Sequence, residues 1–474
     1  MDRSYSDTEV KGLIAEAMAP LLARIAALEK RVVELEAENT ALKSEVARLK
    51  KNSSNSSKPP SSDIVKPPKP PLPHGGKRKI GGQPGHAKHE REPFPRERID
   101  RTFDYELAAP GKLIPLDSWR VVQQVELVEP PFIVTEHRAR EYRDPATGRS
   151  LIAPFPPEVR AAGLLGPRLS ALVGYLKGGC RMSYGLIATL FEDVLGLEVS
   201  TGQLAKVVQK SSQALAPAYQ QLLEALPTQE YLGIDETGHK DRGDAMWTWC
   251  FRAVEFVVFR ILDSRATKVL HETLGKDFAG VIGCDYFSVY RNFLKESRCL
   301  MQFCQAHLIR DVKFLITLPD RSTRRWANKL LKAIGRLFHV LHRRKAMTAE
   351  KWGRALRRAR DQILHIARRP PATADARTLA HRFRTHGREY FTFLEHAGVE
   401  PTNNRTEQAI RFVVQDRKAT QGTRGQAGQT WCQRIWSVLG TCRLQGRSAF
   451  DFLVQTLRNH FQRITTPQLL PAEP

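Results

Sequence analysis

The sequence has few of the features that mark secreted or membrane-embedded proteins. Its seven cysteines are an odd number in 474 residues and do not group into short pairs, which excludes a disulfide scaffold. No apolar run approaches the roughly 18 residues that cross a membrane. The opening residues, MDRSYSDTEV, do not join a basic stretch to an apolar one, as a secretory signal does. We therefore expect a cytoplasmic protein without a membrane partner.

Acidic residues are also outnumbered. Fifty Asp and Glu stand against 74 Lys and Arg, which gives a formal net charge of +24 and a pI near 9.9. Such an excess predicts an anionic partner, and we favour nucleic acid. An anionic membrane and a merely solvated basic surface are the alternatives.

Residues 9–51 carry a heptad repeat. Leucine recurs every seven residues from Leu21 to Leu49, and the second core position holds Met, Ile and Val with a single Asn39. Flanking charges such as Arg24 and Glu29 would face each other with opposite signs in a parallel pair. The pattern predicts a parallel coiled-coil homodimer. A single amphipathic helix packed on its own chain is the alternative.

Three segments of different composition follow the heptads. Ser, Asn, Pro, Gly and Lys dominate residues 52–95, which predicts an extended basic linker whose Lys and Arg can lie along phosphates. Residues 96–160 contain the alternating runs SWRVVQQVELV and PFIVTEHRAREY, which predict a small β module. Residues 161–228 have a helical pattern, with Ser200 or Thr201 as the N-cap of one helix. This last segment fits a helix-turn-helix that binds DNA, although ordinary helical bundles share its spacing.

Residues 229–320 predict an α/β fold with a mixed sheet. Five strand-like runs occur there: EYLGIDET, AMWTWCFRAV, FVVFRILDSR, GVIGCDYFS and RCLMQFCQAH. The helical pattern ATKVLHETLG lies between the third and the fourth run. Three adjacent strands, a helix and further strands indicate a mixed sheet with helices packed against it.

The remaining segments are mostly helical. Residues 321–395 are also strongly basic, which indicates a surface for a polyanion or, alternatively, an exposed helical face. Residues 396–474 contain further helical patterns. The candidate nucleic-acid contacts are Arg343, Arg344, Lys345, Arg357, Arg358 and Arg411.

Three acids lie where metal-dependent chemistry is expected. Asp235 ends the first strand run and Asp285 ends the fourth, so their carboxylates meet at one edge if those strands are adjacent. Glu407 lies near the start of a helical stretch opened by PTNN. Three carboxylates aimed at one point can hold two Mg²⁺ or Mn²⁺ ions about 4 Å apart. Acids that act only as caps or loop residues are the alternative.

The order of the short motifs carries a family resemblance. IDETG, CDYFSVY, CQAHLIRD, PTNNRTEQAIR and SVLGTCRLQGR follow one another, and NSSNSSKPPSSD and GGQPGH precede them. In this order the chain resembles the insertion-sequence-66 family of bacterial transposases over most of its length. The resemblance implies a DDE transposase with a ribonuclease-H-like core, in which Asp235, Asp285 and Glu407 match the three catalytic acids. Residues 321–395 would be an insertion between the second and the third acid.

The resemblance also implies an activity and partners. It implies metal-dependent cleavage of transposon-end DNA and strand transfer into target DNA by a nucleoid-associated protein, with accessory proteins of the same element. A catalytically silent DNA-binding dimer that regulates its element is the alternative. Because Glu236 must point away from Asp235 in a continuing strand, we expect it to be a supporting or surface acid.

Zinc is the point at which the sequence departs from that family. Family members carry Cys pairs soon after GGQPGH, whereas the first cysteine here is Cys180. His86 and His89 alone do not make a four-ligand site, so we expect residues 96–160 to fold without zinc. Cys304 and His307 have a metal-like spacing but form only half a site. We expect them to shape the active site.

Overall fold

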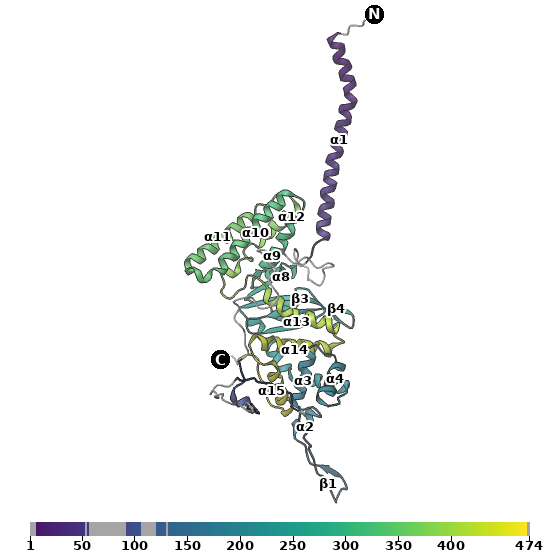
Figure 1. Ribbon diagram of the computed structural model, residues 1–474, viewed down its shortest axis with the longest axis vertical. Coiled ribbons are helices and arrows are strands. Elements are labelled where there is room, and N and C mark those ends of the chain that lie inside the picture. The colour runs from purple at the N-terminus through teal and green to yellow at the C-terminus, as the bar shows by residue number, and fades with distance from the viewer. Residues whose placement is uncertain (1–5, 53–54, 56–91, 106–119, 129–130, 472–474) are drawn as a thin grey trace, which may run out of the picture. The chain divides into compact units, whose positions relative to one another are not determined.

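The computed structural model describes residues 6–52, 55, 92–105, 120–128 and 131–471 (Figure 1). These residues fall into two compact units. The larger one comprises the described residues up to 55 together with 154–189 and 199–471, and the smaller one those from 92 to 153 together with 190–198. His86, His89 and most of the predicted linker lie outside the described residues. Within the described ranges, no helix is long and apolar enough to cross a membrane.

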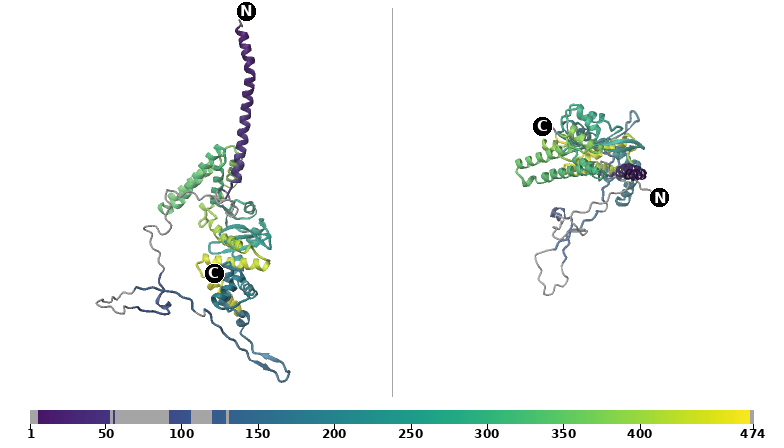
Figure 2. Two further views of the ribbon diagram at one scale, coloured as in Figure 1. Left: turned by 45° about the vertical axis from the view of Figure 1, so that its right-hand side comes forward. Right: turned by 90° about the horizontal axis from the view of Figure 1, so that it is seen from above.

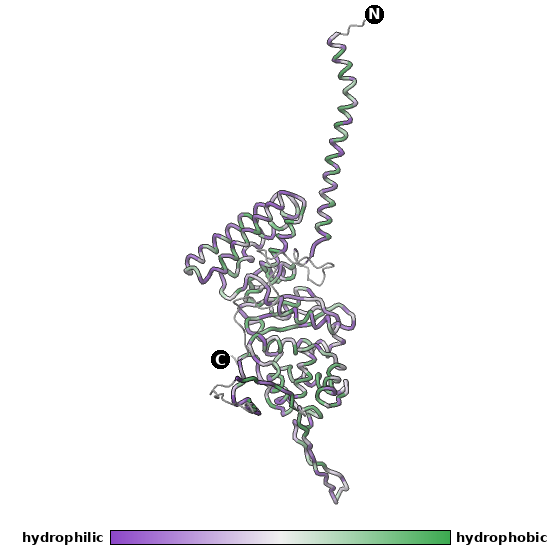
Figure 3. Tube along the Cα trace, in the orientation of Figure 1, coloured by the Kyte–Doolittle hydropathy of each residue, from purple (hydrophilic) through white to green (hydrophobic). Residues whose placement is uncertain are grey.

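α1 (Asp7–Leu49) is a continuous helix over the predicted heptads. Ser6 and Glu9 form a capping box, in which the Ser6 hydroxyl accepts from the backbone of Glu9 and the Glu9 carboxylate accepts from the backbone of Ser6. No part of the described chain buries any residue of α1. Hydrophobic and hydrophilic residues alternate along the helix (Figure 3). The helix is confirmed, and the coiled coil stays a prediction.

The smaller unit contains less β structure than its sequence predicts. β1 (Glu141–Arg143) pairs antiparallel with β2 (Ser150–Ile152), and η2 is a 3-10 turn at Arg96–Arg98. Strands were predicted at 118–128 and 131–142. Among the described residues of these two runs, only the last two of the second run belong to a strand. The apolar side chains of these runs are exposed, as with Ile133 at 90%. An isolated pair of strands with no apolar surface to pack against is only marginally stable in water. This accounts for the difference between the predicted β module and the single short hairpin.

Short helices lead into the sheet. They are α2 (Pro157–Ala162), α3 (Pro167–Gly178), α4 (Tyr184–Leu195), α5 (Thr201–Ala214), α6 (Ala216–Glu224) and the 3-10 turn η3 (Leu226–Thr228). The predicted cap of α5 is confirmed, because the Ser200 side chain accepts from the backbone of Gln203. That this pair of helices binds DNA stays a prediction.

A five-stranded mixed sheet forms from the five predicted runs. The strands are β3 (Tyr231–Asp241), β4 (Asp244–Arg252), β5 (Val257–Leu262), β6 (Val281–Cys284) and β7 (Leu300–Phe303), in the spatial order β5-β4-β3-β6-β7. The first three are antiparallel neighbours, whereas β6 is parallel to β3 and β7 is parallel to β6. The predicted helix between the third and fourth strands is α7 (Lys268–Leu274).

Helices cover both faces of this sheet. α13 (Asn404–Thr420) lies along β3 (Figure 1). α14 (Gln426–Leu444) packs on β5, where the ring of Trp436 meets that of Phe259. On the other face, Tyr290 of α8 (Ser288–Glu296) packs against Trp249 of β4. α15 (Ala449–Gln462) ends the fold beside α3. β3 is therefore a central strand, and its first four residues are buried.

The basic segment between β7 and α13 is helical. It follows α9 (Gln305–Ile316) and contains α10 (Arg321–His342), η4 (Arg344–Ala346), α11 (Ala349–Ala367), α12 (Ala374–His386) and η5 (Thr392–Leu394). α10 and α11 lie side by side in both views of Figure 2. The indole of Trp326 donates to the carbonyl of Ile366 at 2.8 Å, which ties the two helices together. Their apolar stripes face inward and leave the basic side chains outside.

Candidate active site

Two of the predicted acids lie level with each other on adjacent strands. The parallel register pairs Gly233 of β3 with Gly283 of β6. Asp235 and Asp285 each follow two residues later, so they lie at the same level beyond the paired segment. Strand alternation places Asp235 on the face that carries Gly233, and β3 continues beyond it to Asp241 rather than ending at the acid as predicted. Asp285 directly follows Cys284, the last residue of β6. Both residues are half-buried.

The third acid reaches this point because α13 approaches β3 very closely. A Cβ atom on Gly233 would lie 2.1 Å from the hydroxyl of Thr406, so only glycine leaves room for the helix. Asn403, the residue before α13, donates its amide to the carbonyl of Ile234 at 2.8 Å. These contacts fix the first turn of α13, which contains Glu407, on the face of Asp235.

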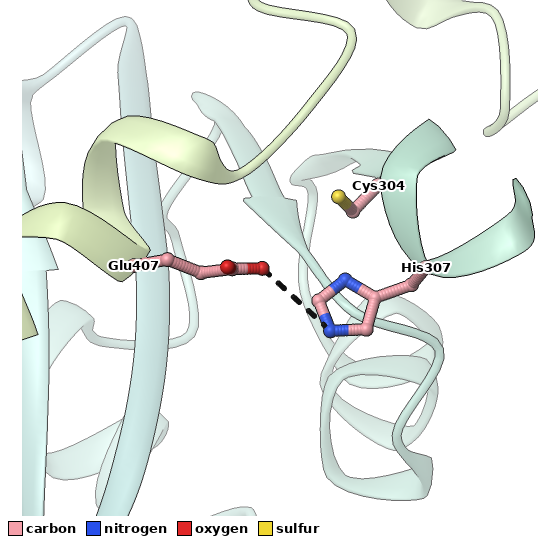
Figure 4. Close-up of side chains that lie close together, drawn as sticks. All are labelled: Cys304, His307 and Glu407. Atoms are coloured by element: carbon pink, nitrogen blue, oxygen red, sulfur yellow. Dashed lines mark ion pairs between the residues drawn. The ribbon is translucent and has the colours of Figure 1, made fainter. Parts of the chain in front are cut away.

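The side chain of Glu407 projects from α13 toward His307 of α9 (Figure 4). Its Oε1 atom is 3.8 Å from His307 Nε2, and its Oε2 atom is 3.5 Å from Arg310. The ligand atoms of Cys304, His307 and Glu407 all lie within 4.8 Å of one another, whereas the three predicted acids do not form such a tight group. The Cys304 sulfur accepts from the backbone of Asn403 at 3.2 Å. His307 therefore contacts Glu407, and Cys304 contacts the residue that precedes the helix of Glu407.

The electrostatics of the acids favour a bound cation. Burial, and then the nearby negative charges of Glu236, Asp285 and Glu407, raise the pKa of Asp235 well above its usual range. Burial and the charge of Glu236 raise the pKa of Asp285 to about 6. Glu407 Oε1 is buried and has no hydrogen-bond partner among the described residues. Hard carboxylate oxygens that repel one another, one of them without a hydrogen bond, fit Mg²⁺ or Mn²⁺.

The motif signals in this region correspond to a known family. Residues 162–430, more than half of the chain, match the Transposase IS66 family. The chain belongs to this transposase family. Residues 2–92 match a family of unknown function, DUF6444. No curated protein matches the chain.

Glu236 occupies the opposite face of the sheet in this transposase-family protein. Its side chain is only 3% exposed and accepts from Arg265 Nη2 at 2.6 Å and Nε at 2.9 Å, and from the hydroxyl of Tyr290. Glu236 is therefore a buried, paired acid rather than a surface acid. Its charge still raises the pKa of both aspartates.

Three cationic partners of the site were not predicted from the sequence. Arg265 and Arg310 hold acids, and Arg417 donates to the hydroxyl of Thr237, two residues after Asp235, at 3.3 Å. The spacing of Arg310, three residues after His307 on one helix face, is a signal that was available. The six predicted nucleic-acid contacts, Arg343, Arg344, Lys345, Arg357, Arg358 and Arg411, are all exposed.

Proposed function

We propose that the protein is a DDE transposase that uses Asp235, Asp285 and Glu407 to cleave transposon-end DNA and to join it to target DNA. One observation carries the proposal. Asp235 within β3 and Asp285 just after β6 each follow a paired glycine by two residues, and a glycine that admits α13 brings Glu407 to the face of Asp235. Family membership supports the transposase role.

The sheet topology supports a ribonuclease-H-like core. Three antiparallel strands, a helix, a parallel strand, a second helix and a last parallel strand follow one another in the chain. The first strand lies at the centre of the spatial order, with the fourth beside it. We infer that the helices between β7 and α13 are an insertion into this core, which places the third acid far along the chain.

The reaction requires no nucleophile from the protein. Two Mg²⁺ or Mn²⁺ ions would supply activation of the attacking oxygen and stabilisation of the leaving oxygen when bound. Asp235, which is central, would contribute to both ion positions, and Asp285 and Glu407 would contribute to one each. Water attack breaks one phosphodiester bond and frees a 3′-hydroxyl. Attack of that hydroxyl on target DNA forms one phosphodiester bond for each bond broken, so no nucleotide cofactor is needed.

The proposal is tested with isosteric substitutions of each acid. Asp235→Asn, Asp285→Asn and Glu407→Gln should each lower cleavage of element-end DNA by about 10³-fold or more, since each removes several kcal/mol of charge stabilisation. Asp263→Asn, which changes an exposed acid, is the matched control. Equal cleavage by wild type and Asp235→Asn would refute the assignment. A wild type that binds ends but never cleaves them would favour the silent regulator.

A homodimer through α1 is the second part of the proposal. Its core positions are exposed in the single chain, with Leu28 at 57% and Val32 at 52%. A parallel second copy of α1 would cover them, with Asn39 fixing the register. Dimerisation would present two active sites to the two ends of one element.

Adjacent valines offer a matched test of the dimer. Val32 lies at a core heptad position, whereas Val33, 65% exposed, lies outside the core. Val32→Lys should weaken dimerisation about tenfold or more, because it buries an unpaired charge, and Val33→Lys should not. Sedimentation velocity of the full-length chain measures both. Equal effects of the two substitutions would contradict a coiled coil in this register.

A further inference from the structure

A cavity with charged walls lies on β3 and α13, the elements that carry Asp235 and Glu407. It has a volume of about 1000 Å³ and lies between the β3–β4 hairpin and the C-terminal end of α13. Five of its lining residues are basic: Lys240, Arg242, Arg417, Lys418 and Arg424. None of its lining residues is acidic. We call this surface the hairpin groove. It includes none of the six nucleic-acid contacts that the sequence predicted.

Backbone geometry builds the hairpin groove. Arg242 and Gly243 both have positive φ, the turn that suits a two-residue hairpin. The loop after α13 adds to the hairpin edge, since the backbone of Thr423 donates to Lys240 and accepts from Arg242, each at 2.9 Å. Gly422 sits at φ +99°, and a Cβ there would lie 2.1 Å from the Lys240 carbonyl. The groove is thus part of the fold rather than a chance arrangement of side chains.

Asp241, an acid beside the groove, is hydrogen-bonded to the loop after α13. Asp241 accepts from the hydroxyl of Thr423 at 2.7 Å and from the backbone of Gly425 at 2.6 Å. His239 is buried in the floor beside Thr423, and burial lowers its pKa to about 4. The charge of the groove therefore comes from its Lys and Arg side chains. Of these, Lys240, Arg242, Lys418 and Arg424 are exposed to solvent.

The hairpin groove begins next to the acids. Strand alternation puts Asp235, Thr237 and His239 on one face of β3, and Arg417 bridges to Thr237. At about 3.3 Å per residue, the groove residues of β3 lie roughly 10–20 Å beyond Asp235. At 3.4 Å per base pair, this corresponds to about three to six base pairs of DNA. A duplex with its scissile phosphate at the acids can therefore reach the groove.

We propose that the hairpin groove binds backbone phosphates of the DNA about three to six base pairs from the scissile phosphate. Its ligand class rests on the proposed function. Closely spaced cations on a concave surface suit a polyanion, and Lys and Arg contacts to phosphates position a duplex without reading its sequence. The groove would hold the duplex in register, so that the scissile phosphate meets the carboxylates.

The test removes three exposed groove charges from the full-length protein. Lys240→Gln, Lys418→Gln and Arg424→Gln are combined, and Lys268→Gln, Lys276→Gln and Arg298→Gln form a control with the same loss of charge at exposed positions away from the groove. Binding is measured without divalent cations, on a duplex of the element's terminal sequence and on a random duplex of equal length. The groove variant should bind both about tenfold or more weakly, with a salt slope smaller by about two to three.

Phosphate ethylation interference supplies the positional readout. Ethylation about three to six nucleotides from the cleavage position should interfere with binding by the wild type and the control, and not by the groove variant. Cleavage of intact ends and strand transfer of pre-cleaved ends are then assayed separately. A loss in cleavage assigns the groove to element-end DNA, and a loss in strand transfer assigns it to target DNA.

Each remaining outcome overturns the proposal. If the groove variant matches the control in affinity and salt slope, the groove does not contact phosphates. If the groove variant binds only the terminal duplex more weakly, and the random duplex as well as the control does, the groove reads bases instead. Neither result depends on catalysis, because Asp235→Asn should keep full binding and interference. A failure of the cleavage mechanism and a failure of the groove are therefore distinguishable.

Discussion

The two ends of the β3–α13 pair carry opposite charges. Asp235 and Glu407 lie where β3 meets β6, whereas Lys240 and Lys418 lie at the hairpin end. Ten residues of helix, about 15 Å, separate Glu407 from Arg417. The acids are half-buried and close enough for charge repulsion to raise the pKa of Asp235, while both lysines are exposed. In the proposed function, the buried acids would bind cations, whereas the exposed lysines would bind DNA phosphates.

The largest effect should come from closing the gap that admits α13. Gly233→Ala would place a Cβ 2.1 Å from the Thr406 hydroxyl, so the start of α13 and Glu407 must move. A shift of about 1 Å at a catalytic group can cost about 10²-fold in rate. We therefore expect cleavage to fall by about 10²-fold or more, while DNA binding in the hairpin groove stays near wild type. Cleavage kinetics report on the acidic end, and DNA binding without metal ions reports on the hairpin groove.

Gly335→Ala is the control for this substitution. Gly335 lies inside α10 with no atom within 4 Å of an added Cβ, so alanine should be neutral or slightly stabilising there. If Gly233→Ala keeps wild-type cleavage, the close approach of α13 does not position Glu407.

These two glycines illustrate what the sequence could and could not reveal. The strands were predictable because each contains a compact apolar run, and Asp235 and Asp285 were visible as acids that follow such runs, although β3 continues past Asp235 to Asp241. The approach of Thr406 to Gly233 joins residues more than 170 positions apart, so no local pattern encodes it. The same holds for the hairpin groove, whose basic residues form no charge run in either segment. The glycines of QGTRGQ, after α13, were the available signal.

A change of pH should affect the acidic end and leave the basic end unchanged. A protonated carboxyl does not bind a cation, so cation affinity rises with pH until the carboxyls ionise. Because the pKa of Asp285 is raised to about 6 and that of Asp235 is also raised, cleavage at subsaturating Mg²⁺ should climb below pH ~6 by up to about tenfold per unit for each carboxyl that must ionise. His239, with a pKa of about 4, and the groove Lys and Arg keep their charge state above pH ~5.

Cleavage and binding measured across the same pH series test this contrast. Raising Mg²⁺ should shift the climb in cleavage to lower pH, since the cation competes with the proton. A flat cleavage profile at low Mg²⁺, or DNA binding that follows cleavage, would contradict the separation of the two ends.

The smallest effect should come from loosening the wall of the hairpin groove while keeping all of its Lys and Arg residues. Asp241→Ala deletes the acceptor for Thr423 and Gly425, whereas Asp241→Asn removes the same charge and keeps an acceptor. Both hydrogen bonds hold the same loop, and a loss equivalent to one of them, about 0.5–1.5 kcal/mol, predicts DNA binding weaker by about three- to tenfold for Ala relative to Asn. Cleavage of saturating DNA should be equal in both, because the acids are untouched. If Ala and Asn bind alike, the loop after α13 does not depend on Asp241, and the groove is shaped by its backbone bridge alone.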